Sequence, residues 1–140
     1  MLKDLANQYA KGELQYGEER ALYHYNCAET MLYACNDYYN LKIDPKTLKG
    51  IIPFGSGFCC EKTCGILSAG IFVLGLMYSE EKPSLNEKVK EATKKWVIAF
   101  EKEFGDLNCD KIKEKHRHEI EKCIPVSLRA AEIFEEVMNQ

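Results

Sequence analysis

Cysteine is the residue whose abundance in this chain points most clearly to chemistry. Seven cysteines occur in 140 residues, and in a cytosolic protein such a density is more typical of metal binding or redox chemistry than of structural disulfides. The odd number agrees with this, because complete internal pairing would leave one thiol over. Any single thiol can instead serve as a small buried hydrophobe. The seven are Cys27, Cys35, Cys59, Cys60, Cys64, Cys109 and Cys123.

Several of these cysteines stand where helices are expected to begin. Cys60 and Cys64 are four residues apart in the first turns of a predicted helix, so both side chains would reach one centre. Cys109 follows the turn GDLN, and Cys123 lies two residues before Pro125 at the entry to the last predicted helix. Free N–H groups at a helix start stabilise a thiolate, the form that attacks disulfides and binds metals. The spacing matches no compact thioredoxin, zinc-knuckle or ferredoxin pattern, so a site has to be assembled from distant segments.

The elements that must position the cysteines are predicted to be helices. The four prolines fall at expected helix ends, apolar residues recur at steps of three and four, and no stretch has strong strand character. We therefore predict an all-α, single-domain chain (1–140), a bundle of about five helices around a buried central helix. The predicted helices span 2–16 (ended or bent at Gly17), 18–39, 58–78, 84–104 (capped by Ser84, stopped by Gly105) and 125 to 140, with a charged segment at 108–121.

Two of these helices are expected to hold reactive cysteines. Cys27 points away from the main apolar stripe of helix 18–39 and towards a second apolar set that includes Met31 and Ala34, so it should face a neighbouring helix. Helix 58–78 is the predicted core helix. Its small residues, among them Gly65 and Gly70, should allow close packing around its cysteine end.

Charge and hydropathy exclude several classes of partner. A net charge of -3 and a pI of about 5.7 provide no broad attraction to phosphate backbones or anionic lipid, so we expect neither a nucleic-acid nor a membrane partner. The segment MLKDLANQYAKGELQYGEER lacks the apolar core of a signal peptide. The strictly apolar part of 58–78 is too short to span a bilayer comfortably. A cytoplasmic location is therefore predicted.

Five short segments, read in order, resemble a known family. They are NCAE (26–29), FGSG (54–57), TCGILSAG (63–70), FGDLNC (104–109) and RAAEI (129–133), with a final cysteine ahead of the last one. Over most of the chain they resemble the C_GCAxxG_C_C family of putative redox-active proteins, which is similar to a domain found with split-Soret cytochromes. The resemblance implies a redox site in which the four family cysteines are Cys27, Cys64, Cys109 and Cys123.

The chain departs from the family pattern close to that set. Ile66 and Ala69 replace the expected alanine and glycine of the motif. The further cysteines, Cys35, Cys59 and Cys60, are available to add or substitute a ligand. Cys60 is therefore included among the candidate metal ligands with the family four.

Three functions follow as alternatives. The first is electron transfer through an iron–sulfur centre, most simply a two-iron cluster on the four thiolates. The second is a metal-free thiol–disulfide protein in which Cys64 attacks and another member of the set resolves, with Cys64 and Cys27 as the predicted catalytic residues. The third is a zinc or soft-metal-binding module. We expect a redox partner protein and allow for a homodimer; whether the chain is an enzyme stays open.

Overall fold

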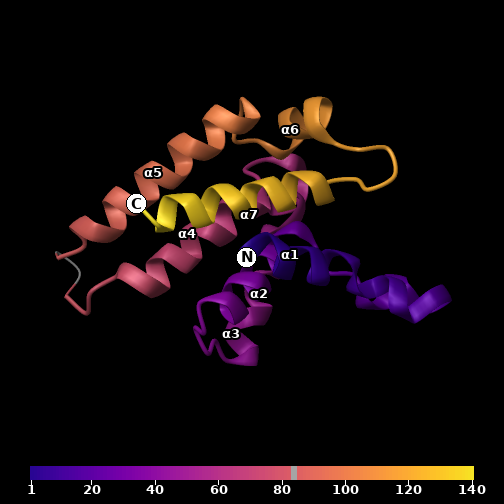
Figure 1. Cartoon of the computed structure of the whole chain (residues 1–140), viewed down its shortest axis with the longest axis horizontal. Coiled ribbons are helices and arrows are strands. Elements are labelled where there is room, and N and C mark those ends of the chain that lie inside the picture. Colours follow the sequence, from indigo (N-terminus) through magenta and orange to yellow (C-terminus); the bar gives the residue numbers. More distant parts are fainter. Residues whose placement is uncertain (83–84) are drawn as a thin grey trace.

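The computed structural model describes residues 1–82 and 85–140, and its regular elements over these residues are helices (Figure 1). The all-α prediction is confirmed. There are seven α-helices in the described part where about five were predicted, because the short α3 and α6 are additional. The predicted N-cap Ser84 lies outside the described residues. The helices are α1 (Leu2–Lys11), α2 (Cys27–Tyr38), α3 (Pro45–Lys49), α4 (Gly65–Tyr78), α5 (Glu87–Phe104), α6 (Cys109–His116) and α7 (Ile124–Met138), with shorter turns η1 (Gly12–Tyr23), η2 (Ile52–Phe54) and η3 (Gly57–Glu61).

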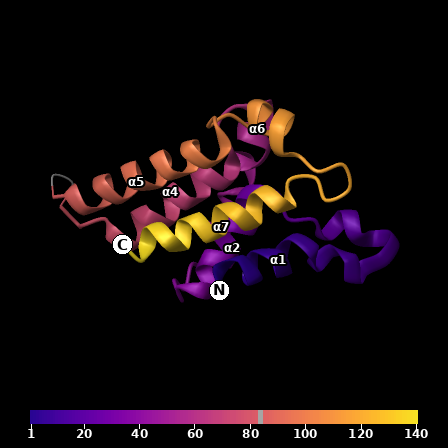
Figure 2. The same ribbon diagram turned by 45° about the horizontal axis from the view of Figure 1, so that its top comes forward.

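The core is built around α4, which packs against α2, α5 and α7, while α1 covers α2 and α7 (Figures 1 and 2). Its aromatic centre is Trp96, whose ring is fully buried and lies edge-on to Phe100 and Phe134. The Trp96 Nε1–H donates to the Leu67 carbonyl oxygen at 3.1 Å, so the indole joins α5 to α4. Within the described residues, no helix combines the length and the apolar character needed to cross a membrane.

The first two predicted helices are shorter than the sequence suggested. Helix α1 ends at Lys11, and η1 follows with a kink at Gly17, where φ is 56° and ψ is -121°. No residue of η1 is buried, and this segment extends beyond the helical body (Figure 1). Without an apolar face to bury, the segment gains little from regular helix formation. The predicted helix 18–39 therefore begins only at Cys27.

The predicted core helix 58–78 also begins later, at Gly65. Ser56, Phe58, Cys59 and Glu61 all have φ between 52° and 61°, which a right-handed helix cannot accommodate. The Cys64 N–H donates to the Leu107 carbonyl instead of to a preceding helical turn. Cys60 and Cys64 therefore do not share a helix face, and that prediction was wrong.

Cys35 lies on the core side of α2 and has no exposed surface. Burial raises the pKa of its thiol well above the ordinary value of 9.0. In the unfolded chain the thiol ionises above about pH 9, whereas the folded chain holds the proton, so the unfolded state is favoured as pH rises. We expect the free energy of unfolding to fall between about pH 9 and 11, and less steeply in Cys35→Ala. Denaturant unfolding at several pH values measures both slopes. Identical slopes would show that Cys35 ionises equally in both states.

Candidate four-cysteine site

Each of the four family cysteines stands at the beginning of a different helix. Cys27 and Cys109 are the first residues of α2 and α6, while Cys64 and Cys123 directly precede α4 and α7. The predicted helix start at Cys123 is confirmed, whereas Cys109 begins α6, a helix that was not among those predicted. Helix starts present backbone N–H groups without helical partners, and these favour negative charge nearby.

All four of these thiols line one cavity of about 780 Å³. Cys64 and Cys109 are buried, whereas Cys27 and Cys123 are partly exposed. The structure thus brings together the four positions that the family resemblance implied. Cys60 is exposed in η3 and does not line the cavity, as is also true of its neighbour Cys59.

A short antiparallel link joins the segments that carry Cys64 and Cys109. Thr63 and Asn108 form an isolated bridge. On either side of it, the Cys64 N–H donates to the Leu107 carbonyl at 2.8 Å, and the Cys109 N–H donates to the Lys62 carbonyl at 2.5 Å. Cys64 directly follows Thr63 and Cys109 directly follows Asn108, so α4 and α6 begin side by side.

Cys27 lines the same cavity because α2 packs closely against α4. A Cβ atom on Gly65 would lie 3.0 Å from the Cys27 sulfur and 3.1 Å from the Ala28 Cβ, so only glycine fits between them without a shift. Cys27 therefore faces a neighbouring helix, as predicted.

A capping box fixes the start of α2. The Asn26 side chain accepts from the Glu29 N–H at 2.9 Å, and the Glu29 carboxylate accepts from the Asn26 N–H at 3.0 Å. The Asn26 Nδ2 also donates to the Ile52 carbonyl at 3.0 Å, which ties α2 to η2. Three hydrogen bonds therefore fix Asn26, the residue directly before Cys27.

Replacement of Asn26 by alanine should therefore lower the free energy of unfolding by about 1–2 kcal/mol, because the cap and the bond to η2 are lost together. It should also make Cys27 react faster with alkylating reagents. Chemical denaturation and the rate of Cys27 modification measure the two effects. Asn139→Ala, at the end of α7, is the control; a loss of stability as large as that of Asn26→Ala would argue against a specific role for the cap.

Burial favours the protonated form of three of the four thiols, those of Cys64, Cys109 and Cys123. Burial raises the pKa of Cys64 to about 12, although the backbone amides of Ile66 and Leu67 act in the opposite direction. Neither amide makes a regular capping hydrogen bond to the sulfur. Burial also raises the pKa values of Cys109 and Cys123. The expectation that helix starts alone would favour thiolates at Cys64 and Cys123 was therefore wrong, because desolvation outweighs the helix N-terminus.

Two cations stand beside the sulfurs. The positive charge of Lys113 acts on both Cys109 and Cys123, and Arg117 acts on Cys123, in each case opposing the rise in pKa. Lys113 is held by Glu61, with Nζ and Oε1 3.0 Å apart. Sequence reasoning missed both cations, because the segment around them reads as a solvated charged face. The pattern that could have indicated Lys113 is its spacing of four residues from Cys109, which brings the two side chains together on one helix.

His24 also lines the cavity, and its Nδ1 lies 2.7 Å from the Glu13 Oε1. Within residues 1–82 and 85–140, no three or more cysteine, histidine or acidic side chains are grouped closely enough to hold a single metal ion.

Comparison with known proteins identifies the family. The matching family model is described as "Putative redox-active protein (C_GCAxxG_C_C)", and its match extends over residues 25–137. Searches of curated proteins and of solved structures gave no significant match. The match covers most of the chain and contains α2 to α7 except for the last residue of α7. This chain, with its four cysteines at four helix starts around one cavity, therefore belongs to the C_GCAxxG_C_C family of putative redox-active proteins.

Proposed function

We propose that the chain transfers electrons through an iron–sulfur centre held by Cys27, Cys64, Cys109 and Cys123. The observation that carries the proposal is the position of these residues at four helix starts around one cavity. Four thiolates are the ligand set of a two-iron, two-sulfide cluster, which when bound supplies one-electron exchange.

The electrostatics of the cavity suit an anionic centre. A cluster on four thiolates carries net negative charge, and Lys113 and Arg117 stand beside two of the sulfurs. The N–H groups at the helix starts add further positive potential. Together these groups would offset part of the cost of holding negative charge in a largely buried site.

The raised pKa of Cys64 favours a metal centre over the metal-free alternative. A thiol with a pKa near 12 presents almost no thiolate at neutral pH, so Cys64 is a poor attacking group for disulfide exchange. Metal binding displaces the thiol proton and removes this obstacle.

Anaerobic purification followed by iron, sulfide and zinc analysis tests the proposal. We expect a coloured protein with about two irons and about two sulfides per chain, a visible absorbance that bleaches on reduction, and a paramagnetic signal in the reduced state. Each of Cys27→Ser, Cys64→Ser, Cys109→Ser and Cys123→Ser should lose most of the iron.

Cys59→Ser and Cys60→Ser are the matched controls, because these thiols are exposed and do not line the cavity. Both should keep the full iron content. Iron-free protein with one zinc per chain would overturn the proposal in favour of a zinc module. Metal-free protein with a reversible disulfide inside the set would overturn it in favour of thiol–disulfide exchange.

A further inference from the structure

The cavity wall is strongly cationic, although the chain as a whole is acidic. Five lysine or arginine side chains line it against two glutamates, in a chain whose net charge is -3. One of the two glutamates, Glu13, is already paired with His24. The cations are Lys11, Arg20, Lys113, Arg117 and Lys122.

Part of this charge is not neutralised by an ion pair. Lys113, which opposes the rise in the pKa of Cys109 and Cys123, is paired with Glu61. Within the part of the chain that the structure describes, Arg20, Arg117 and Lys122 are exposed and form no ion pair. Positive potential therefore remains at the opening of the cavity.

The remainder of the wall is apolar. Ile66, Ile112 and Val126 are buried at its inner side, and Leu14 and Ile120 are exposed, the latter with 83% of its surface accessible. A volume of about 780 Å³ lies in the range of sites that hold small organic molecules. Apolar walls with a few charged groups are typical of such sites.

Two segments border the opening. The segment η1 contributes Glu13, Leu14 and Arg20, and the connection between α6 and α7 contributes Arg117, Glu121 and Lys122. Figures 1 and 2 show both extending beyond the helical body at the same end of the molecule. Since the family match begins at residue 25, η1 adds Leu14 and Arg20 to the cavity wall from outside the matched region, while its Glu13 is paired with His24.

We propose that the cavity selects small organic anions with an apolar body as the reactants of the four-cysteine site. The proposal rests on the proposed function only in taking the four cysteines as the reactive groups. Exposed cations attract the anion to the opening, and the isoleucine and valine side chains contact its apolar part. An electrically neutral molecule of the same shape gains only the apolar contacts.

Two aromatic disulfide reagents test this selection on the reduced, metal-free chain of 140 residues. 5,5′-Dithiobis(2-nitrobenzoate) is a dianion, and 2,2′-dithiodipyridine is neutral. In both reactions a cysteine thiolate attacks the reagent disulfide, a protein–reagent disulfide forms, and one aromatic thiolate leaves. It is detected as the yellow thionitrobenzoate or, after protonation, as the pyridine-2-thione that absorbs in the near ultraviolet. The ratio of the two rate constants cancels the thiolate fraction of the protein.

The measurement is made in a Cys59→Ser/Cys60→Ser background, so that the reacting thiols are those of the cavity; Cys35 is fully buried. Arg20→Glu/Lys122→Glu reverses two charges at the opening. At low salt we expect the anion-to-neutral ratio to fall by roughly tenfold in this variant. In the chain that keeps Arg20 and Lys122, raising the salt concentration should also lower the anion-to-neutral ratio. This second test needs no charge variant.

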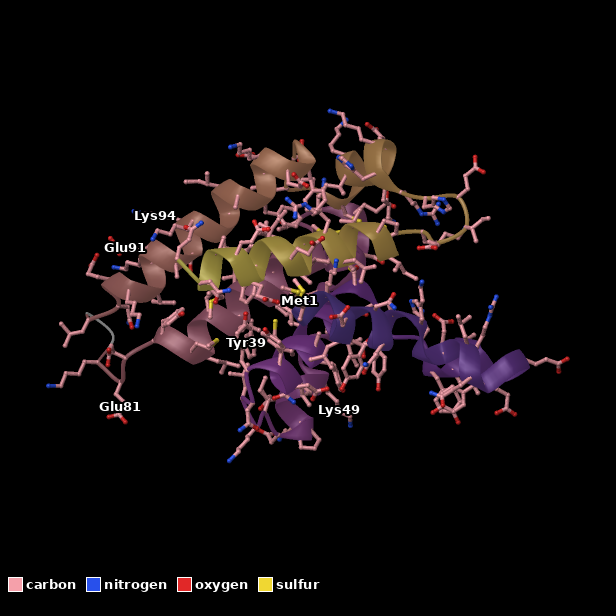
Figure 3. All side chains as sticks on the ribbon, in the orientation of Figure 1. Met1, Tyr39, Lys49, Glu81, Glu91 and Lys94 are labelled. Atoms are coloured by element: carbon pink, nitrogen blue, oxygen red, sulfur yellow. The ribbon has the colours of Figure 1, made fainter. Side chains whose placement is uncertain are left out.

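Lys94→Glu/Lys95→Glu is the matched control, because both lysines are exposed on α5 and neither lines the cavity. Figure 3 shows Lys94 away from the connection between α6 and α7. The control variant makes a charge change of the same kind and should leave the ratio within about twofold. In the chain that retains Cys59 and Cys60, their faster reaction should be insensitive to the charge reversal.

A ratio that responds neither to salt nor to Arg20→Glu/Lys122→Glu would overturn the inference. So would an equal response to Lys94→Glu/Lys95→Glu, since the effect would then reflect net charge alone. These outcomes are separate from those for the proposed function: an iron-free chain can still show the charge effect, and an iron-loaded chain can lack it.

Discussion

Replacement of Trp96 by alanine is expected to lower the free energy of unfolding by about 3–5 kcal/mol. The indole is fully buried at the junction of α4, α5 and α7 and contacts the rings of Phe100 and Phe134. Its removal leaves a large cavity and also leaves the Leu67 carbonyl without the bond from Nε1. Denaturant unfolding followed by circular dichroism measures the loss.

Ile98→Ala is the control for this result, because Ile98 lies in the same helix with 67% of its surface exposed. Its effect should stay within about 0.5 kcal/mol. If Trp96→Ala were no more destabilising than Ile98→Ala, the indole could not be at the centre of the core.

The second large effect is expected for Gly65→Ala, because the added methyl group would lie within the site itself. Its Cβ would be 2.7 Å from the Phe54 carbonyl oxygen and 3.0 Å from the Cys27 sulfur. Either α2 or η2 must move, and we expect a loss of stability of about 1–3 kcal/mol. On the proposed function, most of the iron should be lost as well. Unfolding and metal analysis of the same preparation measure both.

Gly75→Ala provides a contrast of opposite sign in the same helix. The nearest atom to its added Cβ would be the Ser79 Oγ, 3.9 Å away. In that open position alanine should raise stability by about 0.5–1 kcal/mol, since it is the better helix former. If Gly65→Ala were also stabilising, the close approach of α2 and α4 would be refuted.

The sequence contained enough information for the fold class and for the buried faces of the long helices. Trp96, Phe100 and Phe104 recur at helical spacing and are all buried in α5. Gly105, predicted to stop this helix, has the left-handed conformation that ends it, with φ of 79°. Periodicity succeeds here because one face of each long helix meets the core.

Periodicity failed where the local backbone departs from a regular helix. The stretch before Cys64 is rich in apolar and small residues, so it read as an extension of the core helix. The positive φ angles of Phe58 and Cys59 depend on tertiary contacts, among them the pairing of Lys62 with Cys109. Hydrogen bonds between segments so distant in sequence leave no periodic pattern.

The members of the site were predicted better than their chemistry. The family pattern implied four cysteines, and all four line one cavity. The position of Cys64 at a helix start was expected to lower its pKa, but burial raises it. Burial of a single thiol depends on which helices surround it, and this information comes only with the assembled fold.

The order of the four cysteines along the chain also determines when the site can form during synthesis. Cys27 leaves the ribosome early, whereas Cys123 follows the whole α4–α5 pair and α6. Helix α7, which begins directly after Cys123, must also reach α1, where the Leu2 N–H donates to the Glu135 carboxylate. On the proposed function, a centre on all four thiols can therefore form only after α7 has been synthesised and has packed on α1, which makes the site one of the last parts of the fold to be completed.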